Sequence, residues 1–121
     1  EVIFKSHVSD RTDWRKMLKG QAENIDLLAI RDRLMGECND EILALQQQFG
    51  EQAIMPLTEQ TAVTISYPVE QYPEKIKSFN LDKTPEISGV LQGIKGQYLI
   101  FDTGVINIRK YTGYNILMVT E

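Results

Sequence analysis

Cysteine and histidine are almost missing from this sequence of 121 residues, which has one of each, Cys38 and His7. A single cysteine excludes a disulfide within the chain and fits a reducing compartment, so we expect a cytoplasmic protein. One histidine and one distant cysteine leave a zinc site within the chain without enough ligands. Because no set of His, Cys and carboxylates clusters on the predicted loops, we do not expect an enzyme that is complete within this chain.

Long hydrophobic runs and an excess of positive charge are missing as well. No apolar run reaches about 18 residues, so no membrane span is expected, and no signal-peptide pattern is found. The net charge of −4 and pI near 5.0 argue against a wholly basic nucleic-acid binder, but not against a local basic patch. Residues 1–60 hold eleven acidic and seven basic residues, whereas residues 61–121 hold six of each. The chain begins with Glu1 instead of Met, which indicates a piece of a longer protein.

The last third of the chain, residues 86–121, is rich in β-branched and aromatic residues and is divided by closely spaced glycines. This composition predicts strands at 87–94, 97–101, 105–109 and 114–120. The links between them are too short for a crossover helix, so neighbouring strands are predicted to be antiparallel. Apolar residues occur at both parities, which indicates a sheet that is covered on both faces.

The first half of the chain is predicted to be helical. Apolar residues spaced three and four apart predict one long helix at about 24–49, which Gly50 ends and in which Cys38 is a small core residue. A short helix at 13–19 precedes it, with Trp14 as a core anchor and Gly20 after its end. Two further strands are predicted at 62–67 and 75–79.

Together these elements predict an α+β fold. N-terminal helices, with one long helix at about 24–49, pack on a six-stranded antiparallel sheet or a small, partly closed barrel. Residues 1–50 form the helical segment and residues 51–121 form the antiparallel meander or barrel, and the two are expected to pack together as one domain.

Cations and aromatic residues alternate along the meander and its turns, and they form the candidate nucleic-acid-binding set: Lys95, Gln97, Tyr98, Arg109, Lys110, Tyr111 and Tyr114. Such a surface could stack bases and neutralise phosphates, as small barrels do. The alternative is that the tyrosines pack inside the fold and the cations are ordinary solvated turn residues. Both interpretations stay open at this level.

The triplet Asp102-Thr103-Gly104 matches the active-site triplet of aspartic proteases. Val105 follows it where those enzymes have Ser or Ala, and only seventeen residues remain after Gly104, although a flap follows the triplet in those enzymes. We therefore expect a turn in which Asp102 bonds the backbone and Gly104 takes a positive φ.

Three runs of the sequence closely resemble the C-terminal part of a bacterial domain-of-unknown-function family: GVLQGIKGQYLIFDTGVINIRKYTGY (89–114), SFNLDKTPEISG (78–89) and SDRTDWRKMLKG (9–20). The resemblance covers essentially the whole chain. It implies a longer parent protein whose N-terminal half carries several Cys-x-x-Cys pairs, which look like zinc sites. It also implies a segment similar to GIY-YIG nucleases in that half.

The same resemblance makes Glu1 a candidate for the helical Glu that binds the divalent metal in GIY-YIG nucleases. The Tyr and Arg that act with this Glu would lie outside the chain, so we expect the chain itself to be inert as a nuclease. Zinc and a divalent metal are expected in the full-length parent and not within this chain.

These observations lead to two functional hypotheses. The leading one is an accessory C-terminal module of a nucleic-acid-acting bacterial protein, with the parent's N-terminal half and a nucleic acid as partners and no membrane contact. The alternative is a structural or protein-interaction domain that caps the N-terminal half, or dimerises, without binding nucleic acid.

Overall fold

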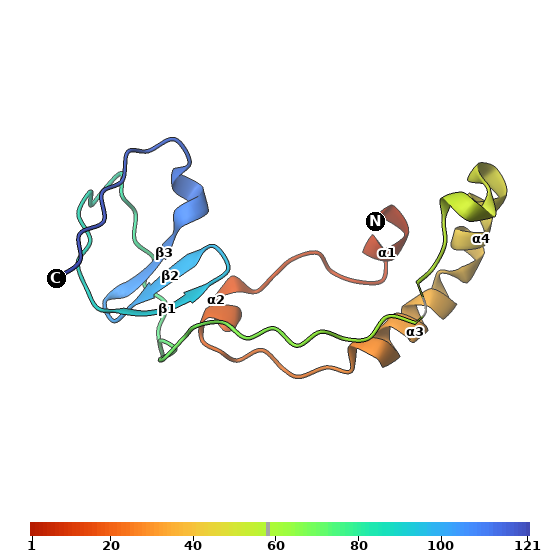
Figure 1. Cartoon of the computed structure of the whole chain (residues 1–121), viewed down its shortest axis with the longest axis horizontal. Coiled ribbons are helices and arrows are strands. Elements are labelled where there is room, and N and C mark those ends of the chain that lie inside the picture. The colour runs from red at the N-terminus through yellow and green to blue at the C-terminus, as the bar shows by residue number, and fades with distance from the viewer. Residues whose placement is uncertain (58) are drawn as a thin grey trace. The chain divides into compact units, whose positions relative to one another are not determined.

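The computed structural model describes residues 1–57 and 59–121, and the chain divides into two compact units. Unit 1 consists of Glu1–Thr12 and Glu23–Thr64, and unit 2 consists of Asp13–Ala22 and Ile65–Glu121. Unit 1 holds helices α1 (Val2–Lys5), α3 (Leu27–Glu37) and α4 (Asn39–Phe49) and the 3-10 helix η1 (Glu51–Ala53). Unit 2 holds helix α2 (Trp14–Leu18), strands β1 (Leu91–Lys95), β2 (Tyr98–Phe101) and β3 (Gly104–Asn107), and the 3-10 helix η2 (Ile108–Tyr111) (Figure 1).

Helices and an antiparallel sheet make this an α+β fold, which confirms the predicted class at that level. Among the helices that are described, none is both long enough and apolar enough to cross a membrane.

Two helices separated at Cys38 replace the single helix predicted at 24–49. Asp26 begins α3 by accepting a hydrogen bond from the backbone N–H of Ala29 (3.0 Å), and α4 ends before Gly50, where φ is +94°. At Cys38 the backbone leaves helical geometry, with φ −99° and ψ 10°. Residues 36–40 include Gly, Cys, Asn and Asp, which have low helix propensity, and this local weakness outweighs the apolar periodicity. The prediction of one continuous helix is therefore wrong, although its apolar stripe does bury Cys38 and Ile42.

The sheet of unit 2 is an open antiparallel meander in the order β1-β2-β3. Lys95 pairs with Tyr98 and Phe101 pairs with Gly104, so each hairpin closes with two residues. The first hairpin needs Gly96, whose φ is +58°, because two-residue turns favour left-handed backbone there. The antiparallel arrangement predicted from the short turns is confirmed.

The six-stranded sheet or partly closed barrel is wrong, because the described residues form three strands. Of the segments predicted as strands at 62–67, 75–79 and 114–120, only 75–79 reaches this sheet, through an isolated bridge from Ser78 to Val105. A second isolated bridge joins Val69, just after the first segment, to Gly93. Residues 68–70 hydrogen-bond β1 on one edge, and residues 77–79 hydrogen-bond β3 on the other. Both edges are thus partly occupied by irregular chain, and strand-like residues elsewhere find no free edge to extend.

The core of unit 2 lies between the sheet and α2. Leu18, Ile100 and Val105 are fully buried, and Trp14 and Met17 pack against them. Asp13 begins α2 by accepting a hydrogen bond from the backbone N–H of Lys16 (3.1 Å). The sequence predicts the 24–49 helix as the cover of the sheet, whereas the helix that contributes to this core is the five-residue α2.

Candidate functional site

Lys95, the first cation of the predicted nucleic-acid-binding set, is buried. It is only 8% exposed, and it is the one charged side chain in the buried class among residues 1–57 and 59–121. Its Nζ donates hydrogen bonds to the carbonyl of Met17 (3.0 Å) and to the hydroxyl of Tyr72 (3.3 Å). The same ammonium lies 4.9 Å from the ring centroid of Tyr72 and 5.5 Å from that of Tyr67, within cation–π range. Lys95 therefore joins α2 to the sheet and does not present its charge to a ligand.

Two of the predicted tyrosines are also packed. Tyr98 stacks on Trp14 with ring centroids 5.9 Å apart, and the Arg15 guanidinium lies 4.5 Å from the Trp14 ring. Tyr111 is buried, and its hydroxyl accepts a hydrogen bond from the backbone N–H of Leu81 (3.1 Å). Both rings therefore take part in packing within unit 2.

Arg109, Lys110 and Tyr114 remain exposed, at η2 and just after it. The Tyr114 hydroxyl donates to Oδ1 of Asp82 (2.5 Å), and this hydrogen bond is the main reason that the pKa of Tyr114 is raised. Gln97 is half-buried, and its carbonyl accepts from the backbone N–H of Ile108 (2.9 Å), which places the first turn beside the start of η2. The structure thus gathers part of the predicted set around η2, buries Lys95 and Tyr111, and leaves Tyr98 half-buried.

Asp102 has the structural role predicted for it. Its Oδ1 accepts a hydrogen bond from the backbone N–H of Val90 (2.9 Å), and its own N–H donates to the Val90 carbonyl (3.0 Å). The neighbouring Thr103 hydroxyl donates to the Ser88 carbonyl (3.0 Å). The triplet therefore holds the irregular segment that precedes β1 against the second turn of the sheet.

Glu1 and His7, the candidate metal residue and the single histidine, belong to unit 1. Glu1 is exposed before α1 and makes no capping hydrogen bond with its side chain. Nδ1 of His7 lies 3.1 Å from Oε2 of Glu37, and Arg33 donates to Oε1 of the same carboxylate (2.7 Å). The hydrogen bond from Arg33 is the largest cause of the lowered pKa of Glu37. In the part of the chain that the structure describes, no group of three or more potential ligands gathers around a metal position.

Unit 1 has an open apolar cavity that the sequence analysis did not predict. We call it the unit 1 groove, and its volume is about 240 Å³. Its lining residues are Glu1, Ile3, Phe4, Met35, Ile42, Leu45, Ile54, Met55 and Pro56. They come from α1, from both halves of the broken helix and from the stretch after η1. The apolar triplet 54–56 in a predicted connector was the signal in the sequence, because such residues in a loop need a surface to pack on.

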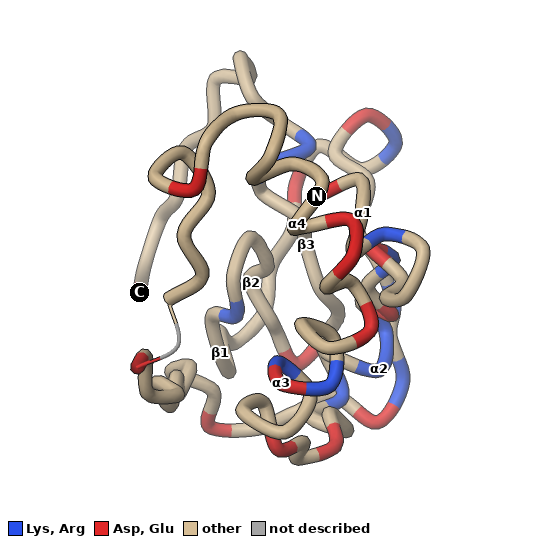
Figure 2. Tube along the Cα trace, turned by 90° about the vertical axis from the view of Figure 1, so that its right-hand side faces the viewer, with Lys and Arg blue, Asp and Glu red and all other residues tan. Residues whose placement is uncertain are grey.

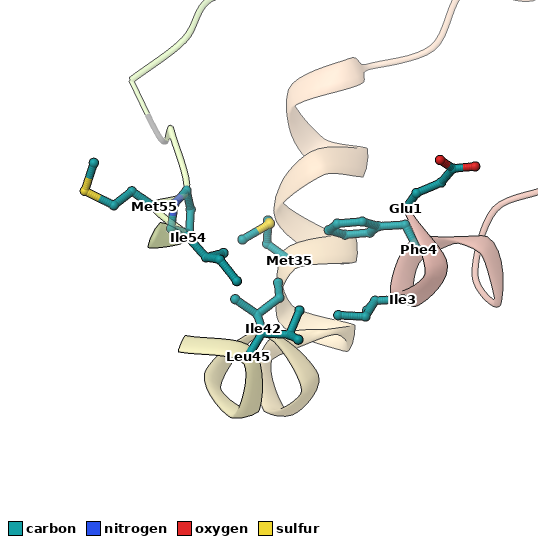
Figure 3. A pocket seen from close by; sticks show the side chains of 9 residues that line it. Glu1, Ile3, Phe4, Met35, Ile42, Leu45, Ile54 and Met55 are labelled. Carbon is teal, nitrogen blue, oxygen red and sulfur yellow. The ribbon is translucent and has the colours of Figure 1, made fainter. Parts of the chain in front are cut away.

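The side chains of the groove converge from three directions. Ile3 and Phe4 point from α1 toward Met35 and the α4 residues, and Ile54 points toward them from the opposite side (Figure 3). The Glu1 carboxylate points away from these apolar groups, at the rim of the groove (Figure 3). The groove can therefore receive apolar groups, and it offers a negative charge at its edge.

Replacing Lys95 by Ala should destabilise unit 2 by about 1–3 kcal/mol, because it removes two buried hydrogen bonds and the packing of the lysine stem between two tyrosines. Lys110→Ala, an exposed change in the same unit, should stay within about 0.5 kcal/mol of the wild type. Trp14 is the only tryptophan and stacks on the sheet, so its fluorescence during urea unfolding reports on unit 2. Equal urea midpoints for the two variants would show that Lys95 does not hold α2.

The family model described as Protein of unknown function (DUF2797) matches residues 1–116. No curated protein and no solved structure matches the chain. Because the family model covers nearly all of the sequence, the chain belongs to the DUF2797 family of proteins of unknown function.

Proposed function

We propose that this chain is a protein-interaction module whose unit 1 groove receives apolar side chains from another polypeptide segment. The observation that carries the proposal is the groove itself, where apolar side chains from α1, α3, α4 and the stretch after η1 converge on open space. Apolar surface that stays open in a folded protein is typical of a binding site for a partner.

Exposed apolar side chains in unit 2 support the same proposal. Leu117 is 87% exposed, and Ile116, Met118 and Val119 are exposed beside it. A chain with this much open apolar surface gains stability when a partner covers it.

The partner that we propose is the N-terminal half of the parent protein, as the resemblance of the sequence implies. In this proposal the Cys-x-x-Cys pairs, the GIY-YIG-like segment, zinc and a divalent metal all belong to that half. Glu1 would then contribute only together with residues of the N-terminal half. The chain described here supplies a docking surface and is not catalytic by itself.

Leu45→Gln should weaken binding of the N-terminal half about five-fold, because Leu45 lines the groove and the change removes about 1 kcal/mol of apolar burial. Leu43→Gln is the matched control, since Leu43 lies on the same helix, is exposed and does not line the groove. Isothermal titration calorimetry of the chain with the separately produced N-terminal half measures both affinities. Equal weakening by both variants, or no binding at all, would contradict the proposal.

Nucleic-acid binding is the second candidate function, and the charge of unit 2 favours it. Unit 2 holds nine Lys and Arg residues and seven Asp and Glu residues, a net charge of +2 in a chain that is acidic overall. Arg109 and Lys110 are exposed on η2 beside the exposed Tyr114. This surface is smaller than the predicted one, because Lys95 cannot contribute to it.

Arg109→Ala combined with Lys110→Ala should weaken binding of single-stranded oligonucleotides and reduce the log–log slope of the salt dependence by about 1.4, because each lost phosphate contact removes about 0.7. Lys16→Ala combined with Lys75→Ala is the control, since both residues are exposed cations of unit 2 on segments other than η2 and the chain next to Tyr114. Fluorescence anisotropy at low and moderate salt measures the effect. If the wild type does not bind at low salt, or if both double variants bind alike, this second function is rejected.

A further inference from the structure

Unit 1 is strongly acidic. It holds ten Asp and Glu residues and only four Lys and Arg residues, so its net charge is −6, against +2 for unit 2. Figure 2 shows acidic positions next to the N-terminus and by α4, and both acidic and basic positions on α3. A surface with this field attracts cationic partners and repels anionic ones.

Three of the four cations of unit 1 are already paired with carboxylates of the same unit. Lys5 pairs with Asp10 (3.3 Å), Arg31 with Asp32 (2.7 Å) and Arg33 with Glu37 (2.7 Å). These three ion pairs neutralise most of the positive charge of unit 1. The remaining carboxylates are therefore left to set the sign of the surface around the groove.

Acidic residues lie in or next to the segments that line the groove. Glu1 lines the groove directly, Asp40 and Glu41 are in the first turn of α4, and Glu51 is in η1, three residues before Ile54. The charge of Glu41 acts on Cys38, which places Glu41 close to the junction of α3 and α4. Within residues 1–57 and 59–121, no ion pair neutralises Glu41 or Glu51, whereas Glu1 carries the α-ammonium of the chain beside its carboxylate.

From the apolar lining and the acidic elements around it, we infer that the occupant of the unit 1 groove is a basic amphipathic helix. A cavity of about 240 Å³ has room for one or two large aliphatic side chains, which a helix presents at positions three or four apart. Lys and Arg on the flanks of that helix would meet Glu1, Glu41 and Glu51. The inference rests on the proposed function, and it adds the chemical class of the segment that docks.

Three labelled helical peptides with the same two leucine anchors test the inference. They carry Lys and Arg, Gln, or Glu at all flanking positions, and their affinity for the chain is measured by fluorescence anisotropy. The basic peptide should bind best, at least ten-fold more tightly than the acidic one at low salt. The difference should shrink as salt is added, because the pairs are at an exposed rim.

A charge-reversal variant tests whether the charges around the groove cause this preference. Glu41→Lys combined with Glu51→Lys should weaken the basic peptide several-fold and strengthen the acidic one. Glu70→Lys combined with Glu86→Lys makes the same change of charge on exposed positions of unit 2 and should have little effect on either peptide. Far-UV circular dichroism shows that the helices are intact in each variant.

The outcomes distinguish between docking at the groove and the basic character of the segment that docks. If all three peptides bind equally and Leu45→Gln weakens each of them, the groove is a docking site and the basic class is wrong. If the basic peptide binds but Leu45→Gln has no effect, attraction is purely electrostatic and the inference is overturned. If no peptide binds in a way that depends on Leu45, both the inference and the docking function of the groove are rejected.

Discussion

The amount of apolar surface that the chain can bury by itself is the constraint on which the rest of the structure depends. Seven hydrophobic residues are buried in the described part, shared between two units, and each unit is near the size at which a single core gives only marginal stability. Many large apolar side chains stay exposed, among them those at 116–119 and Met55 at the groove. The open sheet, the broken helix and the groove are all consistent with a chain that a partner must complete.

Within unit 2, one buried ammonium compensates for part of this shortage. Lys95 reaches the carbonyl of Met17 near the C-terminal end of α2, where the partial negative charge of a helix favours a cation. Tyr72 accepts a second hydrogen bond from Lys95 and packs against Gly20, where a Cβ would come within 2.7 Å of its ring. This arrangement fixes a helix of five residues on the sheet, which its few apolar contacts would hold only weakly.

The sequence correctly predicted elements whose position depends on a local signal that the tertiary structure does not override. Gly96, Gly50 and Gly20 mark a turn and two helix ends, and each has a positive φ in the structure. It was insufficient where a segment needed an available neighbour: 62–67 and 114–120 have the composition of strands, but pairing depends on a free sheet edge, which composition does not report. The prediction that Lys95 is exposed failed for a related reason. The alternating pattern of a strand places apolar residues inside and charged residues outside. In β1 this is reversed, because Lys95 is buried and Ile94 is 41% exposed.

The groove was missed because its residues come from four separate stretches of the sequence. Periodicity identifies the stripe that holds Ile42 and Leu45, but it does not show that Ile3 and Ile54 approach that stripe and leave space between them. The excess of acid in the first half of the chain was visible in the composition. Composition alone does not show that those carboxylates belong to the same unit as the apolar groove, which the structure does show.

Amide hydrogen exchange of the chain alone tests the central claim most directly, because slow exchange requires hydrogen-bonded and protected backbone. The account predicts slow exchange in β2 and at the paired positions of β1 and β3, with rates close to those of an unfolded peptide at residues 115–120 and 62–66. Protection of both segments at the level of β2 would show that the isolated chain already completes a larger sheet. That result would contradict the claim that a partner is needed to cover them.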